Sequence, residues 1–249
     1  MLAVTASGPF TDDDWRFEVK WDGWRAQVSL VDRLRVRSRH GYDLLERFAG
    51  IGRLAEGLRG PVILDGELVA IRDGRPAFGA LAASGAALVF VAFDCLYDRD
   101  GWALEDPLDV RLERLASAVA PGAPHLVVAD GLVGAGEALY AQVRAHGLEG
   151  VMAKRRSSRY QPGRRSPDWQ KVIAGQEAWC PVERLAREDG TLWAWVRPPG
   201  SDAAQRLPCA PGVVAPDGRV GRARVHFREL TASGRFRHGR VLALEGPPP

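Results

Sequence analysis

Short segments rich in β-branched and aromatic residues recur through the first 175 residues, and they constrain the fold more than any other feature of the sequence. They lie at 16–31, 33–38, 62–71, 88–97, 125–129, 150–155 and 169–173. Most are joined by short turns rather than by regularly spaced helices. The pattern therefore predicts an α+β fold of mixed, largely antiparallel sheets with helices packed outside.

Four segments between or beside these strands predict helices: 44–60, 76–84, 106–122 and 136–147. Asp106 and Pro107 are typical of an N-cap and a first helical position. Gly147 is typical of the residue that follows a helix end. The helices are few, so they cover the sheets rather than form a bundle.

The character of the chain changes after residue 178. Helical periodicity disappears, and 179–245 consists of short strand-like segments separated by turn sequences such as EDG and PPG. We therefore expect two domains, 1–175 and 176–249, the second a small β-barrel. Trp179, Trp193, Trp195 and Phe227 suit either its core or a stacking surface, and we expect most of them in the core.

The charge and hydropathy of the chain limit the kinds of partner that it can bind. The net charge is +3, and residues 176–249 hold the surplus, with 11 basic against 8 acidic residues. The arginine-rich stretches 154–171 and 218–240 suit a phosphate backbone, although a solvated basic face explains them as well. No apolar run approaches the roughly 20 residues of a membrane span, so we expect a cytoplasmic protein. The three cysteines show neither zinc-ligand spacing nor a disulfide framework.

Lysine is rare: of 34 basic residues, three are lysines, Lys20, Lys154 and Lys171. A lysine ammonium can lose its proton and act as a nucleophile, whereas an arginine guanidinium effectively cannot. In KWDGWR, Lys20 comes just before Gly23, where the backbone must turn or approach a ligand, and Arg25, a fixed cation. These letters alone fit an exposed turn equally well. Similar settings around the other two lysines favour a chemical role.

Six motifs occur in order: KWDGWR, SRHG, DGELV, VFVAFDCLY, EGVMAK and WQKV. Together they resemble the nucleotidyltransferase motifs of ATP-dependent DNA ligases, in particular the ligase module of bacterial end-joining enzymes. The resemblance spans about residues 1–173. It implies an ATP-grasp-like adenylation domain followed by an OB-like barrel, with ATP, Mg²⁺ or Mn²⁺ and nicked or broken DNA as ligands. It also admits end-joining proteins as partners, and we expect a monomer.

The resemblance implies roles for the first motif. Lys20 would attack the α-phosphate of ATP, release pyrophosphate and hold AMP as a phosphoramidate. Glu18 would meet the adenine amino group. Arg25 would bind ribose or phosphate oxygens, and Asp22 and Gly23 complete this part of the nucleotide site.

The middle motifs add further nucleotide contacts. Arg39 would face a phosphate of the nucleotide or of DNA. Glu67 would contact ribose or help to hold the metal, and Asp65 lies two residues away on the same strand face. The residues alone predict that Phe93 is a core side chain, whereas the resemblance places an aromatic ring here against adenine.

The last two motifs imply charge around the α-phosphate. Glu149 would position Mg²⁺, which prefers carboxylate and phosphate oxygens. Lys154 and Lys171 would stabilise the negative charge that develops in the transition state.

Two family features are absent. The last motif usually has a second lysine, and this chain has Ile173 there. The usual arginine followed by Asp-Lys near the end of the second domain is also missing. The expected activity is ATP-dependent joining of 3′-hydroxyl and 5′-phosphate ends. The alternative is a reduced homologue that binds nicked DNA or seals only pre-adenylated ends. A capping enzyme or RNA ligase is a weaker option, and no module precedes Lys20 as an NAD-dependent ligase would require.

Overall fold

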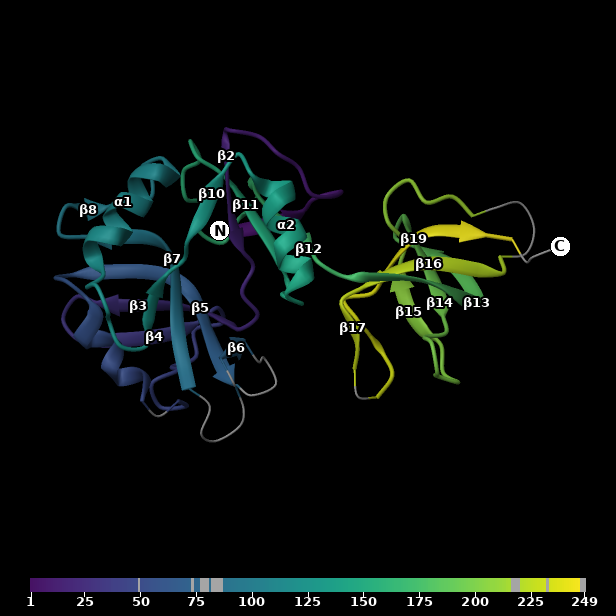
Figure 1. The fold of residues 1–249 in the computed structure, drawn as a ribbon, viewed down its shortest axis with the longest axis horizontal. Coiled ribbons are helices and arrows are strands. Elements are labelled where there is room, and N and C mark those ends of the chain that lie inside the picture. The colour runs from purple at the N-terminus through teal and green to yellow at the C-terminus, as the bar shows by residue number, and fades with distance from the viewer. Residues whose placement is uncertain are drawn as a thin grey trace. The chain divides into compact units, whose positions relative to one another are not determined.

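The computed structural model describes residues 1–48, 50–72, 74–76, 81, 87–215, 220–231 and 233–246. The chain divides into two units, Met1–Val172 and Ile173–Pro249, each with its own arrangement of strands (Figure 1). No described helix is long and apolar enough to cross a membrane.

The larger sheet of the first unit has seven strands. Its main path runs β4 (Leu34–Ser38), β3 (Trp24–Leu30), β5 (Val62–Arg72), β7 (Ala87–Asp98) and β8 (Gly101–Trp102), with β6 (Arg75–Pro76) on β5 and β9 (Leu126–Val128) on β7. All pairs are antiparallel except β7 with β9. The sheet therefore confirms the largely antiparallel arrangement that the short turns predicted.

A second sheet of five strands completes this unit. Its order is β1 (Leu2–Thr5), β12 (Arg165–Ile173), β11 (Gly150–Arg155), β2 (Trp15–Val19) and β10 (Gly131–Val133). β1 lies parallel to β12, while β2 is antiparallel to both β10 and β11. The sequence patterns did not predict β1 and β10, because segments of three or four residues are too short for their alternation to be recognised.

Two α-helices accompany the sheets. α1 (Leu108–Ala118) packs on β7, and α2 (Gly136–Ala145) packs on β2 and β11 (Figure 1). Both confirm the predicted helices, although Pro107 rather than Asp106 occupies the N-cap of α1. Gly147 has φ +66, the left-handed conformation expected after a helix end.

The other two helix predictions have different outcomes. The segment 44–60 was predicted as one helix, but only the 3₁₀ helix η1 (Ile51–Gly57) forms there. Gly50 precedes it with φ +92, which prevents a continuous helix from running through that position. The predicted helix 76–84 falls largely on residues 77–80 and 82–84, outside the described residues.

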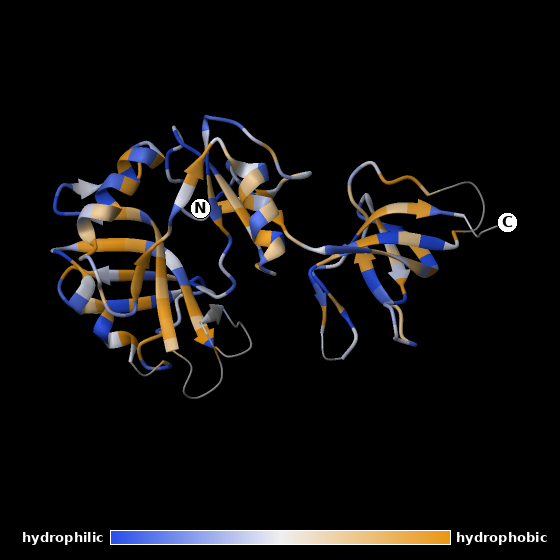
Figure 2. Ribbon diagram, in the orientation of Figure 1, coloured by the Kyte–Doolittle hydropathy of each residue, from blue (hydrophilic) through white to orange (hydrophobic). Residues whose placement is uncertain are grey.

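The main core of the first unit lies against one face of the larger sheet. Val28, Leu64 and Phe90 project into it from β3, β5 and β7, and Leu115 closes it from α1; all four are fully buried. Figure 2 shows the corresponding apolar strands in orange. The other face of the same sheet carries Asp65 and Glu67 together with a smaller apolar cluster that includes Val69 and Val91.

The predicted strand 16–31 is in fact two strands, and they belong to different sheets. β2 ends at Val19 and β3 begins at Trp24. Between them Gly23 lies against β5 so closely that an added Cβ would sit 2.3 Å from the Leu68 carbonyl oxygen. The connection thus carries Lys20 out of one sheet and delivers Arg25 to the other.

The second unit is a curled antiparallel sheet with a small hairpin. The sheet order is β15 (Gln205–Pro208), β14 (Thr191–Val196), β13 (Gln176–Glu188), β16 (Arg222–Phe227) and β19 (Arg240–Glu245). The hairpin pairs β17 (Glu229–Leu230) with β18 (Phe236–Arg237). A single parallel bridge joins Cys209 to Val241, so in the described residues the sheet is a partly open barrel rather than a closed one.

The tryptophans of this unit lie outside its core, contrary to the prediction. Ala194 and Val196 point inward and are fully buried, so strand alternation turns Trp193 and Trp195 to the opposite face. Trp179 is 40% exposed. Phe227 alone of the four aromatic residues is buried in the core, at 5% exposed.

Candidate functional site

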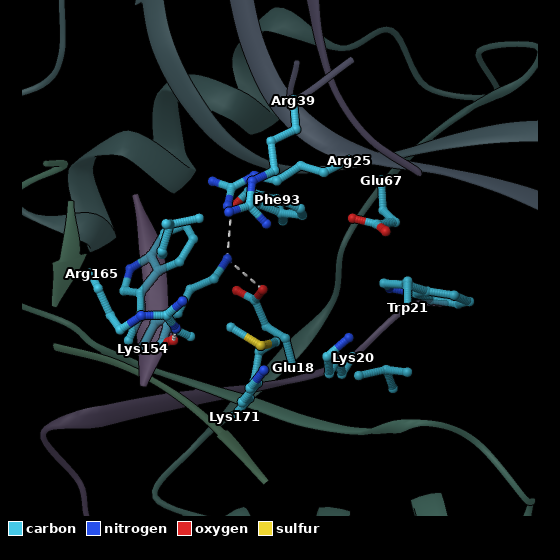
Figure 3. A pocket seen from close by; sticks show the side chains of 15 residues that line it. Glu18, Lys20, Trp21, Arg25, Arg39, Glu67, Phe93, Lys154, Arg165 and Lys171 are labelled. Carbon is cyan, nitrogen blue, oxygen red and sulfur yellow. Dashed lines mark hydrogen bonds and ion pairs between the residues drawn. The ribbon is translucent and has the colours of Figure 1, made fainter. Parts of the chain in front are cut away.

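A pocket in the first unit is lined by residues from both of its sheets (Figure 3). All three lysines line it, and so do the carboxylates Glu18 and Glu67. Arg25, Arg39 and Phe93, which were also predicted, line it too. Glu149 joins the site through Lys20, and Gly23 lies beside Glu67, whereas Asp22 is not among the pocket-lining residues.

Lys20 is positioned by pairing between β2 and β11. Its backbone N–H donates to the Gly150 carbonyl at 2.8 Å, which continues the ladder one residue past β2. Its Nζ then lies 2.6 Å from Glu149 Oε2. The side chain of Lys20 is 22% exposed and that of Glu149 only 5%. The amine is thus accessible from the pocket while its partner is buried.

A second lysine and carboxylate form a buried pair in the pocket wall. Lys154 Nζ lies 2.6 Å from Glu18 Oε2, and it donates to the Phe93 carbonyl at 2.9 Å (Figure 3). The ammonium also lies over the rings of Phe93 and Trp169, 4.6 and 4.7 Å from their centroids. The two side chains are 2% and 3% exposed. Their ion pair joins β2 to β11 below the pocket.

Glu18 retains one unused oxygen. Its Oε1 is buried and has no hydrogen-bond partner in the described residues, although Arg16 Nε lies 3.4 Å away. Burial raises the pKa of the Glu18 carboxyl, and this effect outweighs the opposing attraction of Lys154. An unsatisfied acceptor in a pocket wall is suited to a ligand that donates a hydrogen bond.

Phe93 reaches the pocket because β7 contains a β-bulge. β5 pairs with it as Asp65 with Asp94 and then Gly66 with Ala92, so Phe93 is an extra residue with no partner. Such a bulge re-aims a side chain and releases its backbone groups from the ladder. Phe93 is half-buried between two fully buried neighbours. Its carbonyl is the one that accepts from Lys154.

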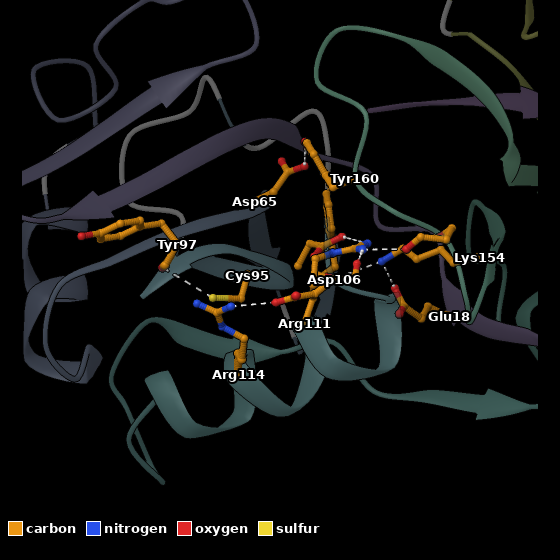
Figure 4. Close-up of polar contacts among 12 residues, drawn as sticks. Glu18, Asp65, Cys95, Tyr97, Asp106, Arg111, Arg114, Lys154 and Tyr160 are labelled. Atoms are coloured by element: carbon orange, nitrogen blue, oxygen red, sulfur yellow. Dashed lines mark hydrogen bonds and ion pairs between the residues drawn. The ribbon is translucent and has the colours of Figure 1, made fainter. Parts of the chain in front are cut away.

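Arg25 forms a bidentate salt bridge with Asp65. Its Nε lies 3.1 Å from Asp65 Oδ1 and its Nη2 lies 2.6 Å from Oδ2. The Tyr160 hydroxyl donates to the same Oδ2 at 2.7 Å (Figure 4). Asp65 is 1% exposed, so its charge depends on these partners.

Two further ionisable groups have shifted pKa values. Burial raises the pKa of Glu67 to about 8; Lys20 and Arg25 act in the opposite direction, while Glu149 and Asp65 raise the pKa further. Burial also lowers the pKa of Lys171, assisted by the cations Lys20, Arg165 and Arg39. At neutral pH the raised pKa therefore favours the protonated form of Glu67, and the lowered pKa makes the Lys171 ammonium lose its proton more easily than an exposed lysine does.

The site offers one or two carboxylates for a metal. The described residues contain no group of three or more acidic, histidine or cysteine side chains placed to hold an ion. Mg²⁺ commonly binds one or two protein carboxylates and takes its other oxygens from phosphates and water. Glu149 and Glu67, which interact with each other and with Lys20, fit that pattern.

Sequence reasoning missed several residues of the site. Trp169, Met152, Arg165 and Trp21 line the pocket, and Tyr160 supports it from behind. Asp65 was noticed only for its strand face. The signal that could have found Arg165 is its place in the arginine-rich stretch, whereas Tyr160 lies in a loop without periodicity and nothing in the sequence ties it to Asp65, 95 residues away.

Comparisons with known proteins agree with this geometry. Residues 1–172 match the family described as "ATP dependent DNA ligase domain". Multifunctional non-homologous end joining protein LigD of Mycobacterium bovis is 42% identical over 167 residues, 63% of this chain and 21% of that protein. LigD of Mycolicibacterium smegmatis is 33% identical over 241 residues, 94% of this chain and 30% of that protein. The chain thus spans a fifth to a third of the length of these relatives.

The fold is similar to a solved structure over both units. A mycobacterial DNA ligase D complexed with ATP and MES aligns with a TM-score of 0.66 at 30% identity. The alignment covers 99% of this chain and 94% of that one.

Proposed function

Since the chain belongs to the family of ATP-dependent DNA ligase domains, we propose that it joins DNA ends through a covalent lysyl-AMP intermediate on Lys20. The amine attacks the α-phosphorus of ATP, a P–N bond forms and pyrophosphate leaves. A 5′-phosphate oxygen of DNA then takes the AMP from the lysine. Finally the 3′-hydroxyl attacks that phosphate, and AMP leaves as the ends are joined.

One observation carries the proposal: an accessible lysine amine lies 2.6 Å from a buried carboxylate in a pocket that holds two further lysines. Lys20 must be neutral to attack. Glu149, with Glu67 and phosphate oxygens, would hold Mg²⁺. The ion would take the place of the Lys20 ammonium beside Glu149 and would offset phosphate charge. Glu67 can bind the ion only after losing its proton.

The pocket walls support a bound nucleotide. The Glu18 Oε1, which lacks a hydrogen-bond partner in the described residues, would accept a hydrogen bond from the adenine amino group, and the partly buried Phe93 ring would stack on the base. Arg25 would meet ribose or phosphate oxygens. Arg39 is exposed at the pocket margin and would contact a phosphate of ATP or DNA.

The two other lysines would act differently from each other. Lys154 is already committed to Glu18 and to the Phe93 carbonyl, so its effect on the phosphate would come through its field and through the wall that it holds. Lys171 is half-buried beside other cations and has no carboxylate partner at bonding distance in the described residues. A phosphate oxygen is therefore the partner that its surroundings favour.

A specific observation keeps the second candidate function open. Position 173 is isoleucine where the resembling motif has lysine, so one phosphate contact is missing. A homologue that seals only pre-adenylated ends would tolerate that loss. The wider setting, a monomer in the cytoplasm with nicked or broken DNA and end-joining proteins as partners, belongs to the same proposal.

The test is incubation of the purified chain with α-labelled ATP and Mg²⁺ or Mn²⁺, followed by denaturing electrophoresis. Lys20→Arg is the matched variant because it keeps the cation and removes the nucleophile. We expect a labelled band that Lys20→Arg and chelation of the metal both abolish. A band of equal strength in Lys20→Arg would refute the assignment. Absence of any band from folded protein would favour the second candidate, which sealing of a pre-adenylated nick then tests.

A further inference from the structure

Tyr160 stands behind the pocket rather than in it. It is 5% exposed and is not one of the residues that line the cavity. Burial and the charge of Asp65 raise the pKa of its phenol, so the hydroxyl remains a hydrogen-bond donor throughout the neutral range. Its acceptor is Asp65 Oδ2, at 2.7 Å (Figure 4).

The same oxygen accepts from Arg25, so the tyrosine and the arginine share one carboxylate. Arg25 Nη2 lies 2.6 Å from Asp65 Oδ2 and 3.3 Å from the Tyr160 oxygen. The Arg25 guanidinium lies 5.6 Å from the Phe93 ring centroid and 5.8 Å from that of Trp169. Unlike Tyr160, Arg25 lines the pocket. Any movement of Asp65 would therefore be felt at the pocket surface.

The loop that carries Tyr160 is anchored independently of the pocket. Arg111 on α1 is fully buried and donates to the Ser158 and Asp106 carbonyls, both at 2.7 Å (Figure 4). Its other nitrogens bind the carboxylate of Asp94 at 2.7 and 3.0 Å. The Tyr160 N–H donates to the Leu104 carbonyl at 2.8 Å. The hydroxyl thus comes from a fixed support.

We infer that Tyr160 is a positioning residue: by donating to Asp65 it fixes the plane in which Asp65 presents the Arg25 guanidinium to the nucleotide. Asp65 can rotate about its last torsion, and a contact from Arg25 alone would turn with it. A second donor from an anchored loop removes that freedom. The inference rests on the proposed function, because the group that Arg25 meets is the bound nucleotide.

The experiment measures formation of the lysyl-AMP adduct as a function of ATP concentration for the full chain and for Tyr160→Phe. The variant keeps the ring, which packs edge-on against Trp169 at 5.9 Å, and removes only the hydroxyl. We expect the KM for ATP to rise about fivefold, while the rate at saturating ATP changes less than about twofold. Tyr97→Phe is the control, since the Tyr97 ring packs on Trp102 and does not line the pocket.

A double-mutant cycle separates positioning from packing. In an Arg25→Gln background, which leaves Asp65 a polar partner, Tyr160→Phe should have no further effect on KM. An unchanged KM in Tyr160→Phe alone, or an equal rise in both backgrounds, would overturn the inference. Failure of the wild type to form any adduct would instead refute the proposed function. Thermal denaturation of each variant shows that the comparison is made on folded protein.

Discussion

Lys154 and Lys20 each lie 2.6 Å from a carboxylate, but they differ in how deeply they are buried. Lys154 is 2% exposed and Glu18 is 3% exposed, so each charge has lost nearly all of its water. Lys20 is 22% exposed and can exchange its partner. A buried pair resists the loss of one member far more than an exposed pair does, because the remaining charge has nowhere to be solvated. The same residue type is therefore locked into a buried ion pair at one position and accessible from the pocket at the other.

Lys154→Met should destabilise the first unit by about 3 kcal/mol, because it leaves Glu18 buried without its cation. For a unit of this size the melting temperature should fall by roughly 6–12 °C. Arg53→Met is the control, since Arg53 and Glu56 are 60% and 53% exposed and their pair should not affect melting. Equal melting temperatures for wild type and Lys154→Met would contradict the structural role of the pair.

Glu67 should make stability depend on pH. Its pKa is about 8 in the folded chain against 4.5 for a solvent-exposed glutamate, so the folded state binds the proton more tightly. The stability that comes from the protonated carboxyl is complete below about pH 4.5 and is lost as pH rises through about 8. Glu67→Gln lacks this titration. Its advantage over wild type should grow between pH 5 and pH 9 by about 3–4 kcal/mol, or roughly 6–16 °C in melting temperature. A difference that stays constant across that range would show that the fold does not raise the pKa of Glu67.

At the scale of strands and helices, breaks in regular structure build the site. The turn at Lys20–Gly23 passes the chain from β2 to β3, and the bulge at Phe93 turns an aromatic ring out of the ladder. Gly23 is required because β5 approaches it too closely for a side chain. Lys20 and Phe93 thus reach the pocket from positions where regular pairing stops.

Gly23→Ala tests this directly. Its Cβ would meet the Leu68 carbonyl oxygen at 2.3 Å and Glu67 Cγ at 2.9 Å, so β3 and β5 must separate. We expect a loss of about 1–3 kcal/mol together with a large fall in adduct formation, measured by thermal denaturation and by labelling with ATP. Gly8→Ala is the matched control, because nothing lies within 4 Å of its added Cβ. Similar behaviour of the two variants would show that the close approach is not restrictive.

The sequence predicted what alternation and turn residues can encode. β5, β7, β11, α1 and α2 were all anticipated, as was the gathering of the three lysines in one pocket. The division of 16–31 between two sheets was not, although Gly23 indicated a turn or a close approach, because no local pattern assigns the residues before and after that turn to different sheets. The Lys154–Glu18 pair was also missed, since the register that joins β2 to β11 depends on strands 136 residues apart. Local patterns carry no information about such pairing.

At the scale of the whole molecule, the chain consists of two units with separate cores. Val28, Leu64 and Phe90 belong to the first core, and Ala194 and Val225 to the second. All described residues of the candidate pocket belong to the first unit. A ligand that binds only there stabilises the unit that holds the pocket.

ATP should therefore protect the two units unequally. With Lys20→Ala, which keeps the complex non-covalent, ATP at about 100 times its dissociation constant should stabilise the first unit by about 2.7 kcal/mol. Hydrogen exchange should slow in β5, β7 and β11 and stay unchanged in β14 and β16. Equal protection of β14 and β16 would show that the nucleotide engages the second unit as well.

The bulge at Phe93 also determines which residues of β7 face the main core. Leu88, Phe90 and Ala92 face the main core, but after the extra residue the next core-facing position is Cys95. Even-numbered residues of β7 therefore face the core before Phe93, and the odd-numbered Cys95 faces it afterwards. Exchanging Phe93 for another residue leaves the bulge intact, whereas deleting it would make the pairs Gly66–Ala92 and Asp65–Asp94 consecutive, so the ladder would become regular and the neighbouring side chains would keep their faces. The extra residue thus adds a ring to the pocket side of β7 without changing the face that any other residue of the strand presents.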